Sequence, residues 1–352
     1  MICVGGQSPN QSASTCEVSD FASYVRKYFR TFAALFVGSA CFLRQDLHEI
    51  MEKSQNTFAL VTGASSGMGL EYARQLAAKG HNVLVVSNRD GDNRKVAEML
   101  HSEYGVSAVP YYADLSKSES SQALYDWTKE NGYVVDILVS NAGMLVFNKL
   151  FNTSARMVDL IVGVHCLATT HLCRLFGGDM KERAEKLSAE RVAAAVAAGA
   201  KPESRRARRA GRLKRGEVGR ILIMASLSAY LPYPTISVYS ATKAYLKSLG
   251  TSLWHEMRDY GVTVTTICPS AVDTPLIKLA PNLRKLAHNL GLMIYPKTLV
   301  RKALTAMFHG RRILVPTVIA KLAVVFCSLL PQHCVYWIAH TPVLKKNVLD
   351  KV

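Results

Sequence analysis

Short apolar runs alternate with longer stretches of helix-forming composition along most of this chain. The runs that predict buried strands are 58–61, 81–86, 135–140, 220–224, 262–267 and 311–315. The stretches that predict helices include 70–79, which stops at Gly80, 157–180 and 239–260. An alternation of strand and helix predicts an α/β domain built on a doubly wound parallel sheet.

The predicted sheet occupies residues 56–316 of a chain of 352 residues, which suits one domain of this class. Residues 1–55 form an extension with an apolar segment at 31–43, which follows three basic residues. This segment is short for a transmembrane helix and closer to a signal sequence or an anchor. Alternatively, Met51 stands just before the first strand, so residues 1–50 are dispensable for catalysis.

Residues 317–352 form a hydrophobic tail. Pro331 and the polar residues after it interrupt the apolar run, so we expect an interfacial segment rather than a single spanning helix. The alternative is an arm that packs on the domain or pairs subunits.

A glycine-rich loop, TGASSGMG at 62–69, joins the first strand to the first helix. A glycine at 63 permits a sharp turn, and glycines at 67 and 69 permit close approach of a phosphate and the neighbouring strand. The helix N-terminus directs N–H groups and partial positive charge at the same place. We therefore predict a dinucleotide pyrophosphate site formed by Gly63, Ser65, Ser66, Gly67, Met68 and Gly69.

The end of the second strand, Ser87-Asn88-Arg89-Asp90, should select the cofactor. An acidic residue there binds the ribose hydroxyls of NAD, whereas neutral and basic residues accept the 2′-phosphate of NADP. Asn88 and Arg89 favour NADP(H). NAD(H) stays possible if Asp90 takes the acidic role, and Arg89 is equally consistent with a solvated surface cation.

Tyr239 and Lys243 are four residues apart on a predicted helix and share a face. A neighbouring ammonium lowers the pKa of a phenol, so we expect Tyr239 to exchange a proton with a substrate oxygen. Ser226, at the end of the preceding strand, is expected to orient that oxygen.

The order of these motifs resembles that of the short-chain dehydrogenase/reductase family: the glycine loop, Asn141-Ala142-Gly143, Ser226, then Tyr239 and Lys243. The resemblance implies a Rossmann fold and hydride transfer between a nicotinamide cofactor and a carbonyl or alcohol. It also implies binding roles for Asp114 at the adenine, Lys243 at the ribose and Thr274 at the nicotinamide carboxamide. Asn141 is expected to support the sheet, and Asp114 alone is equally consistent with a helix N-cap.

Two positions depart from the family pattern. The family usually places an Asn where this chain has His165, and that Asn holds a water that links the Lys to solvent. His165 either replaces it in this catalytic relay or is a satisfied core histidine. The family also favours Pro-Gly where this chain has Pro269-Ser270.

The stretch 271–296 is apolar and is expected to form a lid over a hydrophobic substrate, with simple packing as the alternative. Residues 296–304 and the tail resemble, more weakly, the branch of 3-ketoacyl-CoA reductases and 17β-hydroxysteroid dehydrogenases. We therefore expect a ketone reductase that acts on an acyl or steroid-like substrate. The alternatives are a non-catalytic NADP(H)-binding sensor and an NAD-linked alcohol dehydrogenase.

The net charge of +17 is unevenly distributed, and a large part of it lies in a basic insertion at 181–219. Residues 181–220 hold 13 Lys and Arg against five Glu, where the family has only a short connection. We expect a partly disordered, solvated loop, with contact to acidic lipid heads or RNA as alternatives. It lacks the interleaved aromatic residues that would indicate sequence-specific nucleic-acid binding.

The eight cysteines include no C-x-x-C pair, which indicates a reducing intracellular compartment. We expect the cytoplasm or a cytosol-facing membrane, the endoplasmic reticulum in a eukaryote. His165 and His171 are not joined by carboxylates or thiolates at metal-ligand spacing, so we expect no metal. The resemblance also implies a homo-oligomer.

Overall fold

The computed structural model of this chain describes residues 56–232, 235–274, 284–285, 287–288 and 291–329. The expected N-terminal extension at 1–55 lies outside the described residues. So do the interior of the expected lid at 275–283, 286 and 289–290, and the tail from 330 onward.

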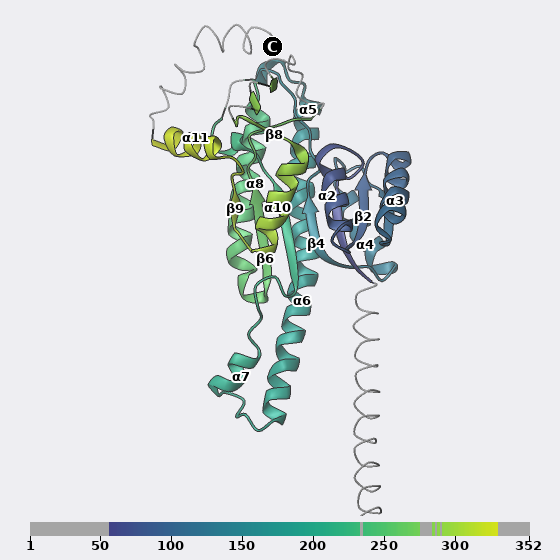
Figure 1. The fold of residues 1–352 in the computed structure, drawn as a ribbon, viewed down its shortest axis with the longest axis vertical. Helices are drawn as coiled ribbons and strands as arrows, with labels where there is room; N and C mark the ends of the chain where they lie inside the picture. Colours follow the sequence, from purple (N-terminus) through teal and green to yellow (C-terminus); the bar gives the residue numbers. More distant parts are fainter. Residues whose placement is uncertain (1–55, 233–234, 275–283, 286, 289–290, 330–352) are drawn as a thin grey trace, which may run out of the picture. The chain divides into compact units, whose positions relative to one another are not determined.

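Seven parallel strands form one sheet in the order β3-β2-β1-β4-β5-β6-β9 (Figure 1). All neighbouring pairs are parallel, which confirms the doubly wound α/β fold. The strands are β1 (Thr57–Thr62), β2 (Asn82–Ser87), β3 (Ala108–Tyr112), β4 (Val134–Ser140), β5 (Gly219–Met224), β6 (Val262–Ile267) and β9 (Ile313–Leu314). The strand order reverses between β1 and β4, so a crevice opens where their carboxyl ends diverge.

Helices cover both faces of the sheet. One face packs α2 (Gly67–Ala77), α3 (Asp90–Tyr104) and α10 (Pro296–Phe308) around an apolar cluster. The other packs α4 (Ser120–Glu130), α6 (Ala168–Ala197) and α8 (Ser237–Glu256) around a second cluster. The central strands are buried on both sides, which explains their continuous apolar sequences.

The longest helical run contains a break in its hydrogen-bond pattern. It begins with α5 (Ala155–Val162), passes through a π-helical turn at Gly163–Leu167 and continues as α6. By length and composition alone, Ala155–Ala197 is the one described helix that is apolar enough to cross a membrane. Its most apolar window is 67% buried inside the domain, as expected of a core helix.

The basic insertion is helical where it was expected to be partly disordered. α6 continues through its first part, and α7 (Arg205–Ala210) folds back against α6. A Cβ atom at Gly211 would stand 2.7 Å from Val192 and 3.0 Å from Ser188, so the two segments are closely packed. Arg191 also forms an ion pair with Glu217. We call residues 181–217 the helical arm.

The segment after β6 begins with β7 (Ala271–Val272), which pairs with β8 (Met293–Ile294). This pairing joins the two ends of the expected lid to each other. The chain then forms α10 and β9 and ends its described part with α11 (Val318–Leu329).

Candidate active site

The glycine loop turns from β1 into α2 in the conformation that its sequence predicts. Gly63 and Gly67 have φ of +67° and +56°, in the left-handed region that favours glycine. A Cβ atom at Gly69 would overlap the Gly63 carbonyl and would come within 2.8 Å of Asn141 Nδ2. Gly69 therefore lets α2 start directly against the ends of β1 and β4.

Thr62 holds the ends of β1 and β4 together. Its hydroxyl accepts hydrogen bonds of 3.0 Å from the backbone N–H groups of Asn141 and Ala142. The Asn141 side chain donates to the Thr62 carbonyl, also at 3.0 Å. This geometry gives Asn141 the supporting position that was expected for it. Thr62 itself was not singled out from the sequence, although it directly precedes the first glycine.

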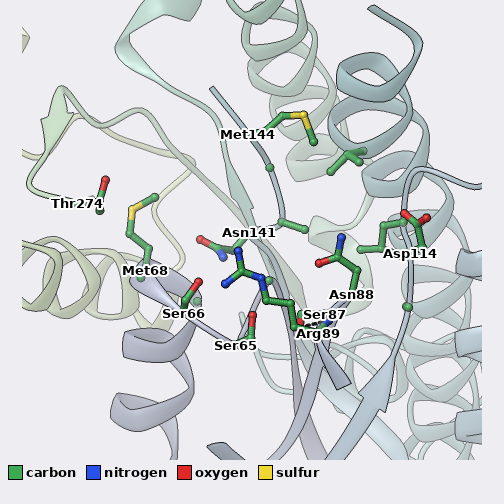
Figure 2. A pocket seen from close by; sticks show the side chains of 18 residues that line it. Ser65, Ser66, Met68, Ser87, Asn88, Arg89, Asp114, Asn141, Met144 and Thr274 are labelled. Atoms are coloured by element: carbon green, nitrogen blue, oxygen red, sulfur yellow. Dashed lines mark hydrogen bonds between the residues drawn. The ribbon is translucent and has the colours of Figure 1, made fainter. Parts of the chain in front are cut away.

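A cavity of about 500 Å³, which we call the dinucleotide cavity, opens beside the glycine loop (Figure 2). The side chain of Ser66, the N-cap of α2, makes no capping hydrogen bond, and the first turn holds no acidic residue. The N–H groups of this helix end are therefore available to phosphate oxygens. The predicted cofactor-binding residues that line the dinucleotide cavity are Gly63, Ser65, Ser66, Gly67, Met68, Gly69, Asn88, Arg89, Asp114, Asn141 and Thr274.

The end of β2 presents a neutral and a basic side chain to this cavity. Asn88 and Arg89 both line it, and Figure 2 shows the Arg89 side chain extending toward Ser66 and Asn141. Asp90 instead begins α3 and pairs with Arg94 at 2.9 Å. Arg89 also stands 3.8 Å from Asp92, with 62% of its side chain exposed, so it is free to turn toward a phosphate.

Asp114 lies at the far side of the same cavity, after β3. Its carboxylate accepts hydrogen bonds from the backbone and the hydroxyl of Ser116, at 3.2 and 2.7 Å. The residue is held in a turn and lines the dinucleotide cavity.

A second cavity of about 250 Å³, which we call the reaction cavity, adjoins the first. Both cavities are lined by Met68, Asn141, Gly143, Met144 and Thr274. The reaction cavity is also lined by three of the four residues predicted to carry the chemistry, Ser226, Tyr239 and Lys243, whereas the fourth, His165, lines neither cavity. The structure therefore brings the proton-transfer residues to the edge of the dinucleotide cavity.

Lys243 lies beside Tyr239 within this cavity. Its Nζ atom is 5.4 Å from the centre of the Tyr239 ring and donates a 2.8 Å hydrogen bond to the Met224 carbonyl. Burial lowers the pKa of Lys243 to about 8, so the ammonium still predominates at neutral pH.

The pKa of Tyr239 moves opposite to the sequence-based expectation. Burial raises it, and a side-chain hydrogen bond with Ser226 only partly opposes that shift. The lowered pKa expected for Tyr239 is therefore not found, because burial decides the direction of the shift. Tyr239 is held as a neutral phenol, the form that donates a proton.

His165 lies in the π-helical turn and is fully buried. Its Nε2 accepts a 3.0 Å hydrogen bond from the backbone N–H of Met144, so the ring proton belongs on Nδ1. Nδ1 then donates to the Thr242 hydroxyl at 2.8 Å, and Thr242 donates to the Tyr239 carbonyl at 2.8 Å.

The catalytic role predicted for His165 is therefore not supported. Both ring nitrogens already have protein partners, so neither is free for a relay water. Burial, with the Lys243 charge, lowers the pKa of His165 to about 2. The residue is a neutral core histidine that holds the Tyr239 backbone. Thr242 completes this chain of hydrogen bonds and was missed, although its place one turn after Tyr239 was a usable signal.

Two comparisons of sequence agree with this geometry. The family model for short chain dehydrogenase matches residues 57–207 and 204–282, and its two segments meet inside the helical arm. The chain is 27% identical to a probable oxidoreductase, EphD, of Mycobacterium tuberculosis over 222 residues, 63% of this chain and 32% of that protein. This chain thus spans about a third of that relative's length. It is 28% identical to mouse 17-beta-hydroxysteroid dehydrogenase type 3 over 268 residues, 71% of this chain and 75% of that protein.

Solved structures show the same architecture. A short-chain dehydrogenase from Sphingobium yanoikuyae in complex with NADPH aligns with a TM-score of 0.60 and 22% identity, over 77% of this chain and 92% of that one. A 3-ketoacyl-(acyl-carrier-protein) reductase from Brucella melitensis complexed with NADH aligns with a TM-score of 0.59 and 25% identity. The alignment covers 74% of this chain and 96% of that one. With the family model matching more than half of its residues, this chain belongs to the short-chain dehydrogenase family, whose members are NAD(P)-dependent oxidoreductases acting on CH–OH groups.

Proposed function

We propose that this protein is an NADP(H)-dependent reductase of ketones on hydrophobic substrates of the acyl or steroid-like kind. The observation that carries the proposal is the reaction cavity, where Ser226, Tyr239 and Lys243 meet a largely apolar wall. That wall includes Met68, Met144, Leu145, Phe147, Met224, Leu227, Ile236 and Val272. An apolar cavity with a few convergent polar groups suits a hydrophobic molecule that carries one reactive oxygen.

The state of Tyr239 favours reduction over oxidation. NADPH, when bound, would supply the hydride in this direction and leave as NADP+. A neutral phenol is the form that protonates the substrate oxygen, and burial keeps Tyr239 in that form. Ser226 bonds to the same phenol, so its hydroxyl is placed to orient the oxygen, while the Lys243 ammonium stabilises the tyrosinate formed.

The choice of NADP(H) rests on Asn88 and Arg89. These residues line the dinucleotide cavity, whereas the carboxylate of Asp90 is paired with Arg94. A cation at this place attracts a ribose phosphate and gives no advantage to a free hydroxyl. The alternative, NAD(H), predicts equal or tighter binding of the cofactor without the phosphate.

The test is NADPH oxidation with a panel of long-chain 3-oxoacyl thioesters and steroid ketones. Tyr239→Phe should lower kcat by at least a hundredfold, because the proton donor is lost, and should leave NADPH affinity within about twofold. Fluorescence titration of NADPH checks the second part. If wild type binds NADPH and reduces no member of the panel, the non-catalytic sensor replaces the reductase.

We also propose two partners for this enzyme. The exposed apolar side chains of α11, among them Leu322 and Phe326, suit a membrane surface. Exposed Leu167 of the π-helical turn and exposed Tyr245 of α8 suit a second copy of the chain. Light scattering of the purified protein tests the second proposal.

A further inference from the structure

Two serine hydroxyls at the reaction cavity have no assigned role. Ser228 and Ser270 line the cavity together with Ser226 and Tyr239. Their Oγ atoms are buried and have no hydrogen-bond partner in the described part of the chain. A buried hydroxyl without a partner costs free energy of folding, and beside a cavity a bound molecule is able to supply the missing partner.

The fold brings these two serines to the same place. Ser228 follows β5 and Ser270 follows β6, and the two strands are neighbours in the sheet. The loops after them run side by side, because the Leu227 N–H donates a 2.8 Å hydrogen bond to the Pro269 carbonyl. Rotation about one side-chain bond moves a serine hydroxyl between its rotamers, so each can turn toward the cavity.

The backbone does not require a serine at position 270. This position is one of the two departures from the family pattern, which favours a glycine here. Ser270 has no positive φ, and its hydroxyl bonds to no described residue. The side chain therefore adds one hydrogen-bonding group to the cavity and gives the fold no hydrogen bond in return.

We propose that Ser228 and Ser270 form a subsite for a second substrate oxygen. The inference rests on the proposed reduction, in which Ser226 and Tyr239 take the ketone oxygen. A second carbonyl oxygen on the same molecule accepts from the Ser228 and Ser270 hydroxyls. The substrate class is then a 3-oxoacyl thioester, which carries two carbonyl groups, rather than a molecule with one isolated ketone.

The enzyme would distinguish a thioester from a simple ketone because the Ser228 and Ser270 hydroxyls stay unpaired when only the ketone is bound. When a substrate lacks the second oxygen, the two hydroxyls stay buried without partners, and the enzyme loses binding energy in the transition state. The apolar wall accepts the chain of either molecule, so it does not distinguish them.

The experiment compares two substrates of equal chain length, a 3-oxoacyl N-acetylcysteamine thioester and a ketone that lacks the thioester carbonyl. Wild type should prefer the thioester. In Ser270→Ala the ratio of kcat/KM for thioester to ketone should fall about tenfold, with a further fall when Ser228→Ala is added. An unchanged ratio overturns the proposal.

A second readout does not depend on activity. Because an unpaired buried hydroxyl destabilises the fold, Ser270→Ala should keep or raise the melting temperature of the protein. Thr263→Val is the matched control, since the Thr263 hydroxyl is also buried and unpaired but lies outside the reaction cavity. Thr263→Val should also keep or raise the melting temperature, and it should leave the ratio of kcat/KM for thioester to ketone unchanged. A large loss of melting temperature in Ser270→Ala instead shows a structural role and overturns the proposal.

Two outcomes separate this inference from the proposed function. If no ketone is reduced, the reductase itself fails. If both substrates are reduced and Ser270→Ala weakens NADPH binding with no change in their ratio, the hydroxyl serves the nicotinamide carboxamide, and only the subsite is wrong.

Discussion

Single residues at this site act through neighbours that are distant in sequence. The Met144 N–H, the His165 ring and the Thr242 hydroxyl form one chain of hydrogen bonds that ends on the Tyr239 carbonyl. A Cβ atom at Gly143 would stand 2.8 Å from His165 Nε2, so this glycine admits the ring. The position of the phenol is thus fixed by its backbone as well as by Ser226.

The sequence predicted which residues form the site better than it predicted their pKa values and hydrogen-bond partners. The glycine loop and the residues Ser226, Tyr239 and Lys243 are recognisable because their spacing follows helix and strand geometry. The pKa of Tyr239 was not predictable, because it depends on burial by segments that follow other strands. The same holds for His165, whose two partners lie 21 positions before it and 77 positions after it in the chain.

Replacement of His165 should change how stability depends on pH. Its pKa is lowered to about 2 in the folded protein, against an ordinary value of 6.5. Between these values the unfolded chain binds a proton that the folded chain does not, so this residue lowers stability as pH falls below about 6.5. Relative to His165→Asn, wild type should lose roughly 1 kcal/mol of unfolding free energy per pH unit from 6 to 4.5. Urea unfolding of both proteins checks this, and parallel curves would contradict a buried neutral imidazole.

Secondary-structure elements followed the apolar pattern closely where both faces of a strand are buried. The run predicted at 262–267 is β6 itself, and 58–61 lies within β1. Elements whose stability comes from distant contacts were less predictable. The predicted helix at 157–180 is split by the π-helical turn and extends to Ala197.

The helical arm is an element whose stability comes from contacts between distant parts of the chain. Its charge and composition indicated a loop, because an isolated basic segment gains little by folding. In the structure Ala207 of α7 is fully buried, and Gly211 permits close packing on α6. The packing of α7 on α6 therefore overrides the unfavourable charge.

Introduction of a charge at this contact should unfold the arm and spare the enzyme. Ala207→Glu places a carboxylate where the native methyl group is fully buried, so α7 should detach from α6. Trypsin should then cleave at Arg205–Arg209 at least tenfold faster than in wild type, because the arginines leave the helix. Ala194→Glu, on an exposed part of α6, should leave the cleavage rate unchanged. Equal rates for both variants and wild type would show that α7 does not depend on this contact.

At the scale of the whole molecule, exposed apolar side chains of the described residues and the basic helical arm lie at opposite ends of the sheet. Exposed Leu150 and Phe151 follow β4, and the exposed side chains of α11 follow β9, so both mark the carboxyl ends of the strands. A Cβ atom at Gly291, near the end of the expected lid, would stand 3.9 Å from Ile319 of α11. The helical arm leads into the start of β5, at the other end (Figure 1).

This arrangement gives the proposed membrane contact two candidate surfaces. The reaction cavity opens at the carboxyl ends of the strands, so under the proposed function a hydrophobic substrate would enter from the side that carries the apolar residues. A bilayer at that side lies away from the arginines of the arm, and a membrane bound through the arm would lie away from the cavity.

Vesicle flotation should therefore respond to the apolar surface and not to the arm. With vesicles of neutral and anionic lipid, Leu322→Glu with Phe326→Glu should reduce the bound fraction at least fivefold, because two exposed apolar side chains would no longer enter the interface. Arg205→Glu with Arg208→Glu should leave binding within about twofold, although it lowers the net charge of the surface by about four units. If the arginine variant is released and the α11 variant stays bound, the arm is the membrane contact and the substrate must reach the cavity through water. Repeating the assay at high salt separates the cases again, since electrostatic attachment weakens with ionic strength and apolar insertion does not.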